Sequence, residues 1–400
     1  MGANWDKTDL GPALKEYYLD EKVRDACYTD LFLMKTLKKT KVEGKTVNKP
    51  LKIGRNLGFG ATVTAANANA SSATFEDWVI PEKKFYQTVY VDGASLEAAQ
   101  SAGKGAWFNV VTEAIDDARK EMAKELEIKL FGNTNASRGK VKAVSGTALT
   151  LVNAADAAFF EKGMKLRVAD TETGTLRTGE AAITSIDRAN GILYHSAGWT
   201  TTISALVVGD FIFRSDEKTA GLNGLLAHTP VTRTGSVTVQ GIDLSTDWTR
   251  LGGIYVAGGN RGTHQTLLEG CGLGKREGSQ PKRIVVSANR YIELVNELGN
   301  NKMYVNTTSA DVGFDKIKIV TPLGALEVVG ATFCPDDYGW AIPDDLQILH
   351  WGPDVMFVAD RGGVQLNLDQ SADRYYLRMH SYCDLYVPQP KDLILFHFTG

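Results

Sequence analysis

The feature that most constrains the fold is a long amphipathic stretch at residues 101–131. Opposite charges one turn apart, Asp116 with Lys120 and Glu125 with Lys129, predict ion pairs on its solvent side. At 1.5 Å per residue such a helix is roughly 40 Å long, which suits a structural strut, and Gly132-Asn133 is a typical end. Apolar residues at three- and four-residue spacing predict one buried stripe, made of Trp107, Val110, Val111, Ala114, Ile115, Ala118, Met122, Leu126 and Leu130.

The preceding stretch, residues 41–92, predicts a long hairpin. It begins with basic residues, passes through a run of small residues at 65–73 with too little apolar bulk to pack, and ends in a strand pattern at 78–91. An isolated two-stranded hairpin is marginal in water, so we expect this one to lie on another surface, and no flanking segment obviously covers it. Two faces alternate in the strand pattern, one with Phe85, Gln87, Val89 and Val91 and the other with Tyr86, Thr88 and Tyr90.

Two further changes of pattern mark separate segments. Residues 1–40 carry helix formers without one clean apolar stripe, which predicts an N-terminal arm of broken helix and extended chain. Residues 139–216 hold short strand candidates separated by Gly, Asn and Asp turns, which predicts a small β-barrel inserted after the long helix. We expect this insertion to be autonomous, so that its excision leaves the remaining core folded.

The rest of the chain predicts a mixed α/β region at 217–350 and a β-rich C-terminus at 351–400. Residues 247–268 predict a helix interrupted by glycines, and 290–298 a helix capped by Asn289. A C-terminal strand usually ties that end into a sheet. Strands are expected at 283–287, 317–320, 326–329, 340–342, 375–383 and 393–398.

Composition indicates a folded protein without a strong nucleic-acid signature. Of the 400 residues 43% are hydrophobic and 23% charged, and the formal net charge is −3, so no basic surface for tight DNA binding is expected. Cys27, Cys271, Cys334 and Cys383 show no paired spacing, which argues against a zinc site or a disulfide framework and for reduced thiols. Neither a signal peptide nor a membrane span is predicted.

No motif predicts catalysis, a cofactor or a metal. Residues 270–275, Gly-Cys-Gly-Leu-Gly-Lys, lack the spacing and the hydroxyl of a phosphate-binding loop and predict a mobile glycine-rich loop. No two of the six histidines lie three or four positions apart. The doublets Asp336-Asp337 and Asp344-Asp345 would supply half of a cation site, but solvated loop charges explain them better. We therefore expect no enzymatic activity, and no thiol or metal requirement.

The order of these segments resembles the Hong Kong 97-type major capsid proteins of tailed bacteriophages. Three stretches carry the resemblance: 75–85 running into the long helix, 281–291, and 375–387 followed by Pro390. It covers most of the chain and leaves residues 139–216 outside the common core. No single motif is diagnostic, because this family is defined by architecture more than by signature.

The resemblance implies the α+β Hong Kong 97-type capsid fold and a division of labour along the chain. Residues 1–40 would be the N-terminal arm, 41–92 the extended loop that lies across a neighbouring subunit, and 139–216 an insertion domain. Residues 93–138 and 351–400 would form the peripheral domain, and 217–350 mainly the axial domain around each capsomer centre. The function implied is that of a major capsid protein.

The resemblance also implies partners. Copies of the chain would form the pentamers and hexamers of an icosahedral head, assembled in the host bacterial cytoplasm around packaged double-stranded DNA that it touches weakly and nonspecifically. A scaffolding protein, a portal at one vertex and a decoration protein would take part, and no membrane. Some relatives carry an N-terminal scaffolding segment; its absence here favours a separate scaffolding protein, unless a prefix was cleaved. Some relatives crosslink a lysine to an asparagine; Lys83 and Lys84 lie in the right loop, but no asparagine partner is identifiable.

Two other functions remain open from the sequence. An encapsulin-like compartment shell would share the fold and enclose protein cargo in place of DNA. An enzyme with residues 139–216 as a ligand-binding β-domain would be monomeric. The inserted barrel favours the phage capsid, because compartment shells tend to be more compact.

The candidate intersubunit contacts lie in the extended loop. Trp78 and Phe85 are the aromatic residues expected to anchor it on a neighbour, since buried aromatics dominate interface energetics. Arg55, Lys83 and Lys84 would be rim charges that meet acidic partners. The alternative for Trp78 is that it packs within its own subunit at the root of the hairpin.

Overall fold

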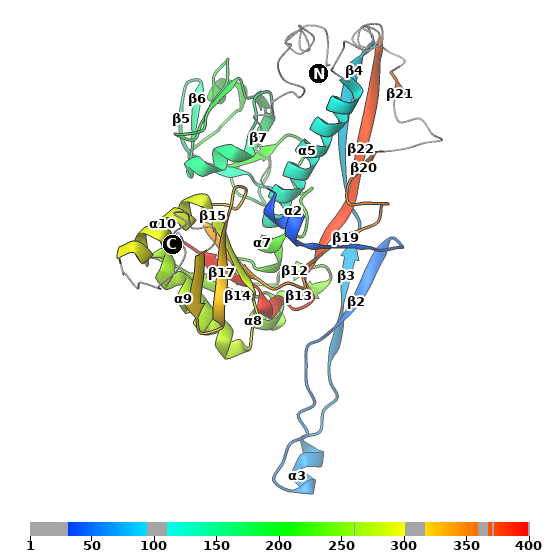
Figure 1. The fold of residues 1–400 in the computed structure, drawn as a ribbon, viewed down its shortest axis with the longest axis vertical. Helices are drawn as coiled ribbons and strands as arrows, with labels where there is room; N and C mark the ends of the chain where they lie inside the picture. The colour runs from blue at the N-terminus through cyan, green and yellow to red at the C-terminus, as the bar shows by residue number, and fades with distance from the viewer. Residues whose placement is uncertain are drawn as a thin grey trace, which may run out of the picture.

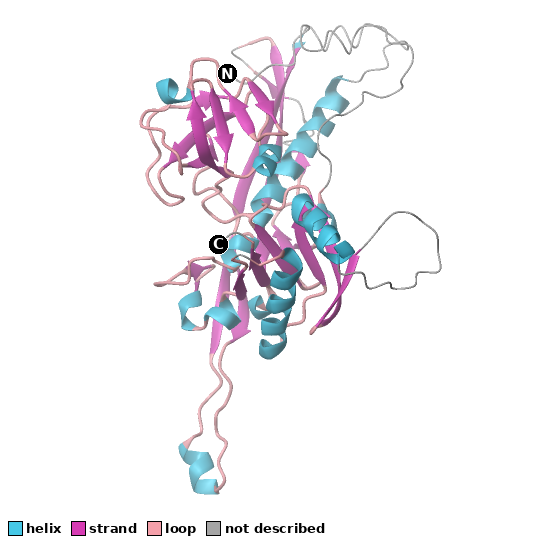
Figure 2. Ribbon diagram, turned by 90° about the vertical axis from the view of Figure 1, so that its left-hand side faces the viewer, coloured by secondary structure: helices cyan, strands magenta, loops and turns pink. Residues whose placement is uncertain are grey.

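A computed structural model describes residues 31–93, 110–259, 261–300, 317–358, 367–369 and 372–398. The long axis of the molecule follows helix α5 (Val110–Phe131) and then a hairpin of β2 (Thr46–Lys52) and β3 (Phe75–Pro81) that leaves the body (Figure 1). A quarter turn shows the same hairpin standing clear of everything else (Figure 2). Among the described residues no helix combines the length and apolar character needed to cross a bilayer.

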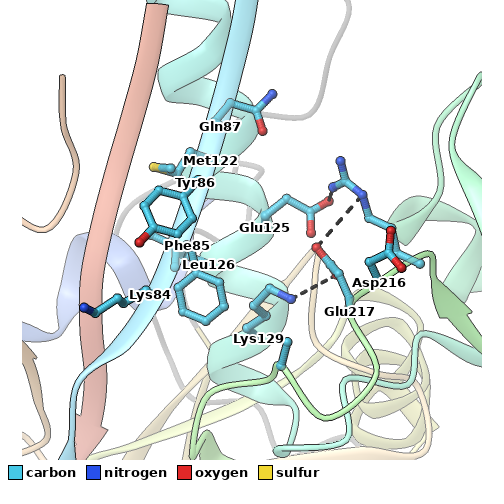
Figure 3. Close-up of a pocket in the computed structure, with 12 residues that line it drawn as sticks. Lys84, Phe85, Tyr86, Gln87, Met122, Glu125, Leu126, Lys129, Asp216 and Glu217 are labelled. Carbon is cyan, nitrogen blue, oxygen red and sulfur yellow. Dashed lines mark hydrogen bonds and ion pairs between the residues drawn. The ribbon is translucent and has the colours of Figure 1, made fainter. Parts of the chain in front are cut away.

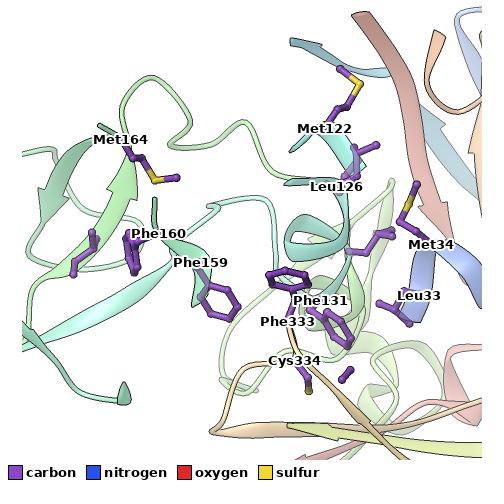
Figure 4. Close-up of a cluster of buried hydrophobic side chains, with 14 of the residues drawn as sticks. Leu33, Met34, Met122, Leu126, Phe131, Phe159, Phe160, Met164, Phe333 and Cys334 are labelled. Atoms are coloured by element: carbon purple, nitrogen blue, oxygen red, sulfur yellow. The ribbon is translucent and has the colours of Figure 1, made fainter. Parts of the chain in front are cut away.

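Helix α5 confirms the predicted long helix over its described part and ends just before Gly132, as expected. Its stripe of Ala118, Met122, Leu126 and Leu130 is buried. The stripe belongs to the main hydrophobic core, together with Leu33 and Met34 of α2 (Phe32–Thr36) and with Phe333 (Figure 4). Residues 101–109, including Trp107 of the predicted stripe, lie outside the described residues.

The predicted solvent side of α5 is correct for Asp116 and Lys120, which are exposed, and wrong for Glu125 and Lys129. Lys124, Glu125, Glu127 and Lys129 are all buried. The Glu127 carboxylate accepts the backbone N–H groups of Leu33 and Met34 at 2.7 and 2.8 Å, which satisfies free donors at the first turn of α2. Glu125 and Lys129 form ion pairs with residues far along the chain instead of with each other.

The longest strand, β22 (Arg374–Tyr386), organises a six-stranded sheet beside α5. Val89, Val91, Leu377 and Met379 are buried, and the alternation predicted for residues 85–91 is confirmed. The other strands of this sheet are β1 (Lys38–Lys41), β4 (Lys83–Asp92), β19 (Gln347–His350), β20 (Phe357–Val358) and β21 (Asn367–Leu368).

The predicted strand at 78–91 is two strands, so the hairpin is shorter than expected. The chain breaks at Glu82 into β3 and β4. Strand β3 pairs with β2, whereas β4 pairs with β22 over its whole length. Pro81, which has no N–H to donate, closes the β2–β3 ladder. Residues 46–81 are called the projecting hairpin below.

Residues 139–216 form a seven-stranded antiparallel sheet, as the short strand candidates predict. Its order is β8-β7-β11-β5-β6-β10-β9, and its two outer strands are separated by only two residues, so the sheet must curl on itself. Phe160 and Trp199 are buried within it. The strands are β5 (Gly139–Ser145), β6 (Ala148–Leu151), β7 (Lys165–Ala169), β8 (Ala181–Ala182), β9 (Ser185–Asp187), β10 (Ile192–Tyr194) and β11 (Phe211–Arg214), with η2 (Ala154–Phe159) and α6 (Trp199–Thr202) between them.

A second six-stranded sheet, in the order β14-β23-β18-β15-β17-β16, carries the α/β region. All the strands predicted there are confirmed. Helices α9 (Thr263–Glu277) and α10 (Ala288–Asn300) pack against it (Figure 2). The strands are β14 (Ile254–Ala257), β15 (Arg283–Ser287), β16 (Ile317–Thr321), β17 (Gly324–Ala331), β18 (Tyr338–Ile342) and β23 (Ile394–His397).

Three local predictions in this region are wrong. Residues 270–275 are no mobile loop but part of α9. Residues 247–268 are not one interrupted helix, because they hold α8 (Trp248–Leu251), β14 and the start of α9. Helix α10 begins two residues early, and the Ser287 hydroxyl, which accepts the N–H of Arg290 at 3.2 Å, takes the capping place expected of Asn289.

The projecting hairpin is rooted in a small third core. Trp78 and Ile80 pack there with Ile242, Leu251 and Leu349. The root region holds short elements that the sequence did not predict: α7 (Leu225–His228), β12 (Thr238–Val239), β13 (Ile242–Asp243), η3 (Leu244–Thr246) and η4 (Pro390–Asp392).

Candidate assembly interface

The tip of the projecting hairpin is held together by local polar contacts. Beyond the β2–β3 ladder the chain continues through residues 53–74, which include the short helix α3 (Val63–Ala68). The Thr62 hydroxyl accepts the N–H of Ala65 at 3.2 Å and caps α3. The Asn69 amide donates to the Phe59 carbonyl at 3.0 Å, and the Leu57 N–H donates to the Ser71 hydroxyl at 3.1 Å. These bonds shape the tip without burying an apolar core.

Large apolar side chains remain exposed on this tip and at the adjoining end of β3. Phe59 is 89% exposed, Val63 78%, Leu57 70% and Phe75 61%. A cluster of exposed apolar side chains on a well-formed segment is typical of a surface that meets a partner. Sequence reasoning missed these four residues, although the motif Leu57-Gly58-Phe59-Gly60, two large apolar residues between glycines, was visible.

Trp78 is not an exposed anchor. Its side chain is completely buried in its own subunit, edge-on to His228 with ring centroids 5.6 Å apart. The indole N–H of Trp78 has no hydrogen-bond partner among the described residues, so packing alone holds the ring. The alternative reading, in which Trp78 roots the hairpin in its own subunit, is therefore the one that the geometry supports.

The other four candidate residues lie in two parts of the chain, a loop of the hairpin and strand β4. Arg55 is exposed near the hairpin tip. Lys83, Lys84 and Phe85 lie on β4, outside the hairpin. Lys84 pairs with Glu82 at 3.3 Å, and Phe85 is half-buried with the Lys129 ammonium 5.3 Å above its ring. Their contact with another subunit stays a prediction.

Phe85 also lines a pocket of about 200 Å³ between β4, α5 and the chain that leaves the insertion (Figure 3). Met122 and Leu126 of α5 form its apolar wall, while Glu125, Lys129 and Glu217 form its charged wall. A dashed line in the figure marks the ion pair of Lys129 with Glu217, and Glu125 is paired with Arg214. The pocket therefore has an apolar wall that faces charged side chains already paired with one another.

That ionic cluster is buried and joins the insertion to α5. Arg138 is 2% exposed at its side chain, and it holds Glu125 with both guanidinium Nη atoms and Glu217 at 2.8 Å. Lys129 binds Glu217 at 3.0 Å, and Arg214 binds Glu125 at 2.9 Å. Residues 138 and 217 flank the insertion on its two sides, so one cluster ties both connections of the insertion to the helix. We call it the ionic joint.

The electrostatics of the ionic joint follow from this pairing. Burial works against the charge of Glu217, but Arg138 and Lys129 outweigh it, and the pKa of Glu217 falls to about 2. Burial likewise opposes the charge of Glu125, yet the Arg138 guanidinium holds the pKa of that carboxyl below its usual range. Both carboxylates are ionised at neutral pH.

The remaining candidate chemical groups are dispersed. Cys271, Cys334 and Cys383 are free and buried, and burial raises the pKa of each thiol, to about 11 for Cys271 and about 12 for Cys383. Cys27 lies outside the described residues. Within the described ranges no group of three or more His, Cys, Asp or Glu residues is arranged to hold a metal ion.

The two acidic doublets do not come together. Asp336 accepts the Ser287 hydroxyl, and Asp337 accepts the amide of Asn153 at 3.0 Å. Asp344 pairs with Arg283 at 3.5 Å. Each doublet is thus engaged in its own local contacts, in line with the solvated-charge interpretation for Asp344 and with a structural one for Asp336 and Asp337.

Comparison with known proteins places this architecture. A scan of protein-family models finds none that matches the sequence, and a search of curated proteins finds no match. Among solved structures, a chain of the cyanophage A-1(L) capsid asymmetric unit superposes with a TM-score of 0.59 at 14% identity, over 95% of this chain and 96% of that one. A chain from the capsid of a native GTA particle superposes with a TM-score of 0.51 at 12% identity, over 97% and 98% of the two chains.

This chain has the Hong Kong 97-type capsid fold. The predicted α+β fold class is confirmed, because the match extends over nearly all of both chains. In this chain α5 is the long helix, and β4 and β22 pack beside it.

Proposed function

We propose that this protein is the major capsid protein of a tailed phage, which self-assembles into the pentamers and hexamers of an icosahedral head that encloses double-stranded DNA. The observation that carries the proposal is the projecting hairpin with its exposed apolar tip. The capsid fold supports it. The protein acts in this proposal as a structural component and not as an enzyme.

The hairpin argues for a partner on energetic grounds. A two-stranded ribbon is marginal in water, and this one keeps Leu57, Phe59 and Val63 in solvent. Burying an apolar side chain of this size contributes roughly 1.5–3 kcal/mol. A second copy of the chain supplies such a surface at every position of a shell, and repetition makes many modest contacts collectively stable.

The other parts of the chain receive roles within the same proposal. Residues 1–40 act as an N-terminal arm, 93–138 and 351–400 as the peripheral domain, 217–350 mainly as the axial domain and 139–216 as an insertion domain. Arg55, Lys83, Lys84 and Phe85 contribute rim contacts between subunits. A scaffolding protein, a portal and a decoration protein complete the particle, which assembles in the host cytoplasm.

A formal net charge of −3 suits a container for DNA. Tight phosphate binding needs many clustered cations, and it would hold the DNA against the wall. A nearly neutral shell instead leaves the packaged DNA in weak, nonspecific contact.

The proposal is tested by electron microscopy of the purified chain, expressed alone and with the scaffolding protein of the same genome. We expect closed shells, and particles taken from an infected host should protect double-stranded DNA from added nuclease. Shells that enclose protein and protect no DNA would support the compartment alternative. A protein that stays monomeric at high concentration in light scattering, with and without scaffolding protein, would contradict both.

A further inference from the structure

A two-residue turn beside the root of the projecting hairpin has an unusual conformation. Strands β12 and β13 are joined by Gln240-Gly241, with φ of +45° and +87°. Two central residues with positive φ make the type of hairpin turn that normally takes Asn-Gly or Asp-Gly. Gln240 is the one departure from that pattern, and its side chain, longer than that of Asn or Asp, bonds outside the turn.

One partner of the Gln240 side chain is a buried carboxylate on β22. The Gln240 side-chain amide donates to Asp384 Oδ2 at 3.0 Å and to the Leu385 carbonyl at 2.8 Å. Asp384 is completely buried and is also held by Asn223, whose backbone N–H lies 3.0 Å from Oδ1 and whose amide lies 2.6 Å from Oδ2. The donors that surround this carboxylate are therefore neutral amides, including the N–H of Leu385 at 3.0 Å.

The turn in its strained conformation points its carbonyl at the hairpin. The backbone N–H of Val79, in the middle of β3, donates to the Gln240 carbonyl at 2.8 Å. Among the described residues this is the only backbone hydrogen bond from β2 or β3 to the rest of the molecule. Gly241 packs on the same residue, since a Cβ at position 241 would lie 3.3 Å from Val79 Cγ2.

We propose that Asp384 and the Gln240-Gly241 turn form a latch that fixes the direction in which the projecting hairpin leaves the body. Asp384 is the positioning residue, Gln240 carries the constraint from the carboxylate to its own backbone, and Val79 receives it. Trp78, the preceding residue on β3, packs into the root core, which includes Val239 and Ile242 on either side of the turn. The root thus remains packed when the latch opens, while the angle of the hairpin becomes free. The latch has a purpose only if the hairpin joins subunits, as proposed above.

The matched test is Gln240→Asn against Gln280→Asn. Asparagine accepts the left-handed conformation more readily than glutamine, but its side chain is one methylene too short to reach Asp384. Gln280 is exposed, so the same chemical change there is a control. Asp384→Asn is a second variant that changes the acceptor of the latch. One acceptor oxygen becomes a donor, which then faces the donors of Asn223 and Gln240.

Hydrogen exchange on unassembled subunits gives the first readout. We expect the Val79 amide to exchange at least tenfold faster in Gln240→Asn and in Asp384→Asn, with β15 and β17 unchanged from the wild-type protein and from Gln280→Asn. Wild-type exchange at Val79 in Gln240→Asn would overturn the latch. So would a uniform rise in every strand, because that is what a merely structural residue produces.

A distance between spin labels at Thr64→Cys and Arg276→Cys gives the second readout, in a Cys27→Ser background. Thr64 lies on α3 at the tip and Arg276 on α9 of the body, and both are exposed. The distance distribution should broaden in Gln240→Asn and stay narrow in Gln280→Asn; equal distributions would overturn the proposal. Both readouts use single subunits, so they report on the latch whether or not the chain builds shells.

Discussion

The ionic joint and the root of the projecting hairpin solve the same physical problem in opposite ways. Each buries carboxylates where two parts of the molecule meet. In the ionic joint, Glu125 and Glu217 face the cations of Arg138, Lys129 and Arg214. At the hairpin root, Asp384 faces amide groups only. The first joins the insertion to α5, and the second fixes a thin hairpin.

The difference shows in the acid–base behaviour of the two sites. Arg138 and Lys129 overcome burial and lower the pKa of Glu217 to about 2. Burial raises the pKa of Asp384 to about 6, although the hydrogen bonds from Asn223 and Gln240 oppose that rise. Charge pairing therefore keeps the carboxylates of the ionic joint ionised at neutral pH. Amide donors alone leave a buried carboxylate whose pKa lies near physiological pH.

The largest expected effect follows from breaking the ionic joint. Arg138→Met should lower the free energy of unfolding by about 3–5 kcal/mol, because it leaves Glu125 and Glu217 buried without their shared cation. Denaturant unfolding of the subunit measures this. Arg250 pairs with Asp247 and its side chain is 60% exposed. Arg250→Met should therefore lower the free energy of unfolding by less than about 1 kcal/mol. Equal losses in the two variants would mean that the joint carries no special weight.

A comparable loss is expected at the hairpin root, where packing replaces charge. Trp78→Ala should lower the free energy of unfolding by about 3–5 kcal/mol, since it empties a fully buried indole site. This effect should be insensitive to salt, unlike that of any exposed ion pair. Subunit melting at two salt concentrations checks it. A melting temperature equal to that of the wild type would restore the interface role first predicted for Trp78.

Local patterns in the sequence predicted the strut and its sheet because both follow simple periods. The stripe of α5 and the alternation in β22 are readable from neighbours in sequence. Helix α9 was missed because its glycines are demanded by distant contacts. A Cβ at Gly270 would lie 2.4 Å from Phe396 Cε1, and one at Gly274 would lie 2.8 Å from Ile394 Cδ1. The strand β23 that forces those glycines lies over a hundred residues away.

The candidate interface was predicted in place but not in detail. The hairpin was expected, yet its anchors were assigned to large aromatic residues without knowing what covers them. Trp78 is covered by Ile242, Leu251 and Leu349, and Lys129 covers Phe85. Glu125 and Lys129 were assigned to the solvent side for the same reason. Their partners Arg138 and Glu217 lie outside the helix and are not visible from its own pattern. Side chains that look alike in sequence differ by their distant neighbours.

A smaller effect is expected in the pH dependence of stability. The contributions of Glu217 and Asp384 to the free energy of unfolding should change in opposite directions with pH. Glu217 has a folded pKa below its unfolded value of 4.5, so its contribution is present above pH 4.5 and is lost as pH falls toward 2. Asp384 has a folded pKa above its unfolded value of 3.8, so its contribution is present below pH 3.8 and is lost as pH rises through 6. Between pH 4 and pH 8, Glu217→Gln should therefore be most costly at neutral pH, and Asp384→Asn at the acid end of the range.

Each pKa unit corresponds to about 1.4 kcal/mol, so the two trends should differ by a few kcal/mol across the range. Unfolding free energies of both variants and the wild type, measured from pH 4 to pH 8, provide the comparison. Parallel profiles for the two variants would show that the cations of the ionic joint do not set it apart from the hairpin root.

The smallest effect on the subunit should accompany the largest effect on assembly, at the hairpin tip. The double variant Leu57→Ser with Phe59→Ser should change the unfolding free energy by less than about 0.5 kcal/mol, because both side chains are exposed in the subunit. The control is Val207→Ser with Val208→Ser, since these side chains are 52% and 65% exposed on the insertion. Particle yield by sedimentation and electron microscopy, measured on all three proteins, tests the central claim most directly. We predict shells from the wild type and the control and none from the tip variant. Wild-type particle yield from the tip variant would contradict the assignment of the projecting hairpin as the contact that builds the shell.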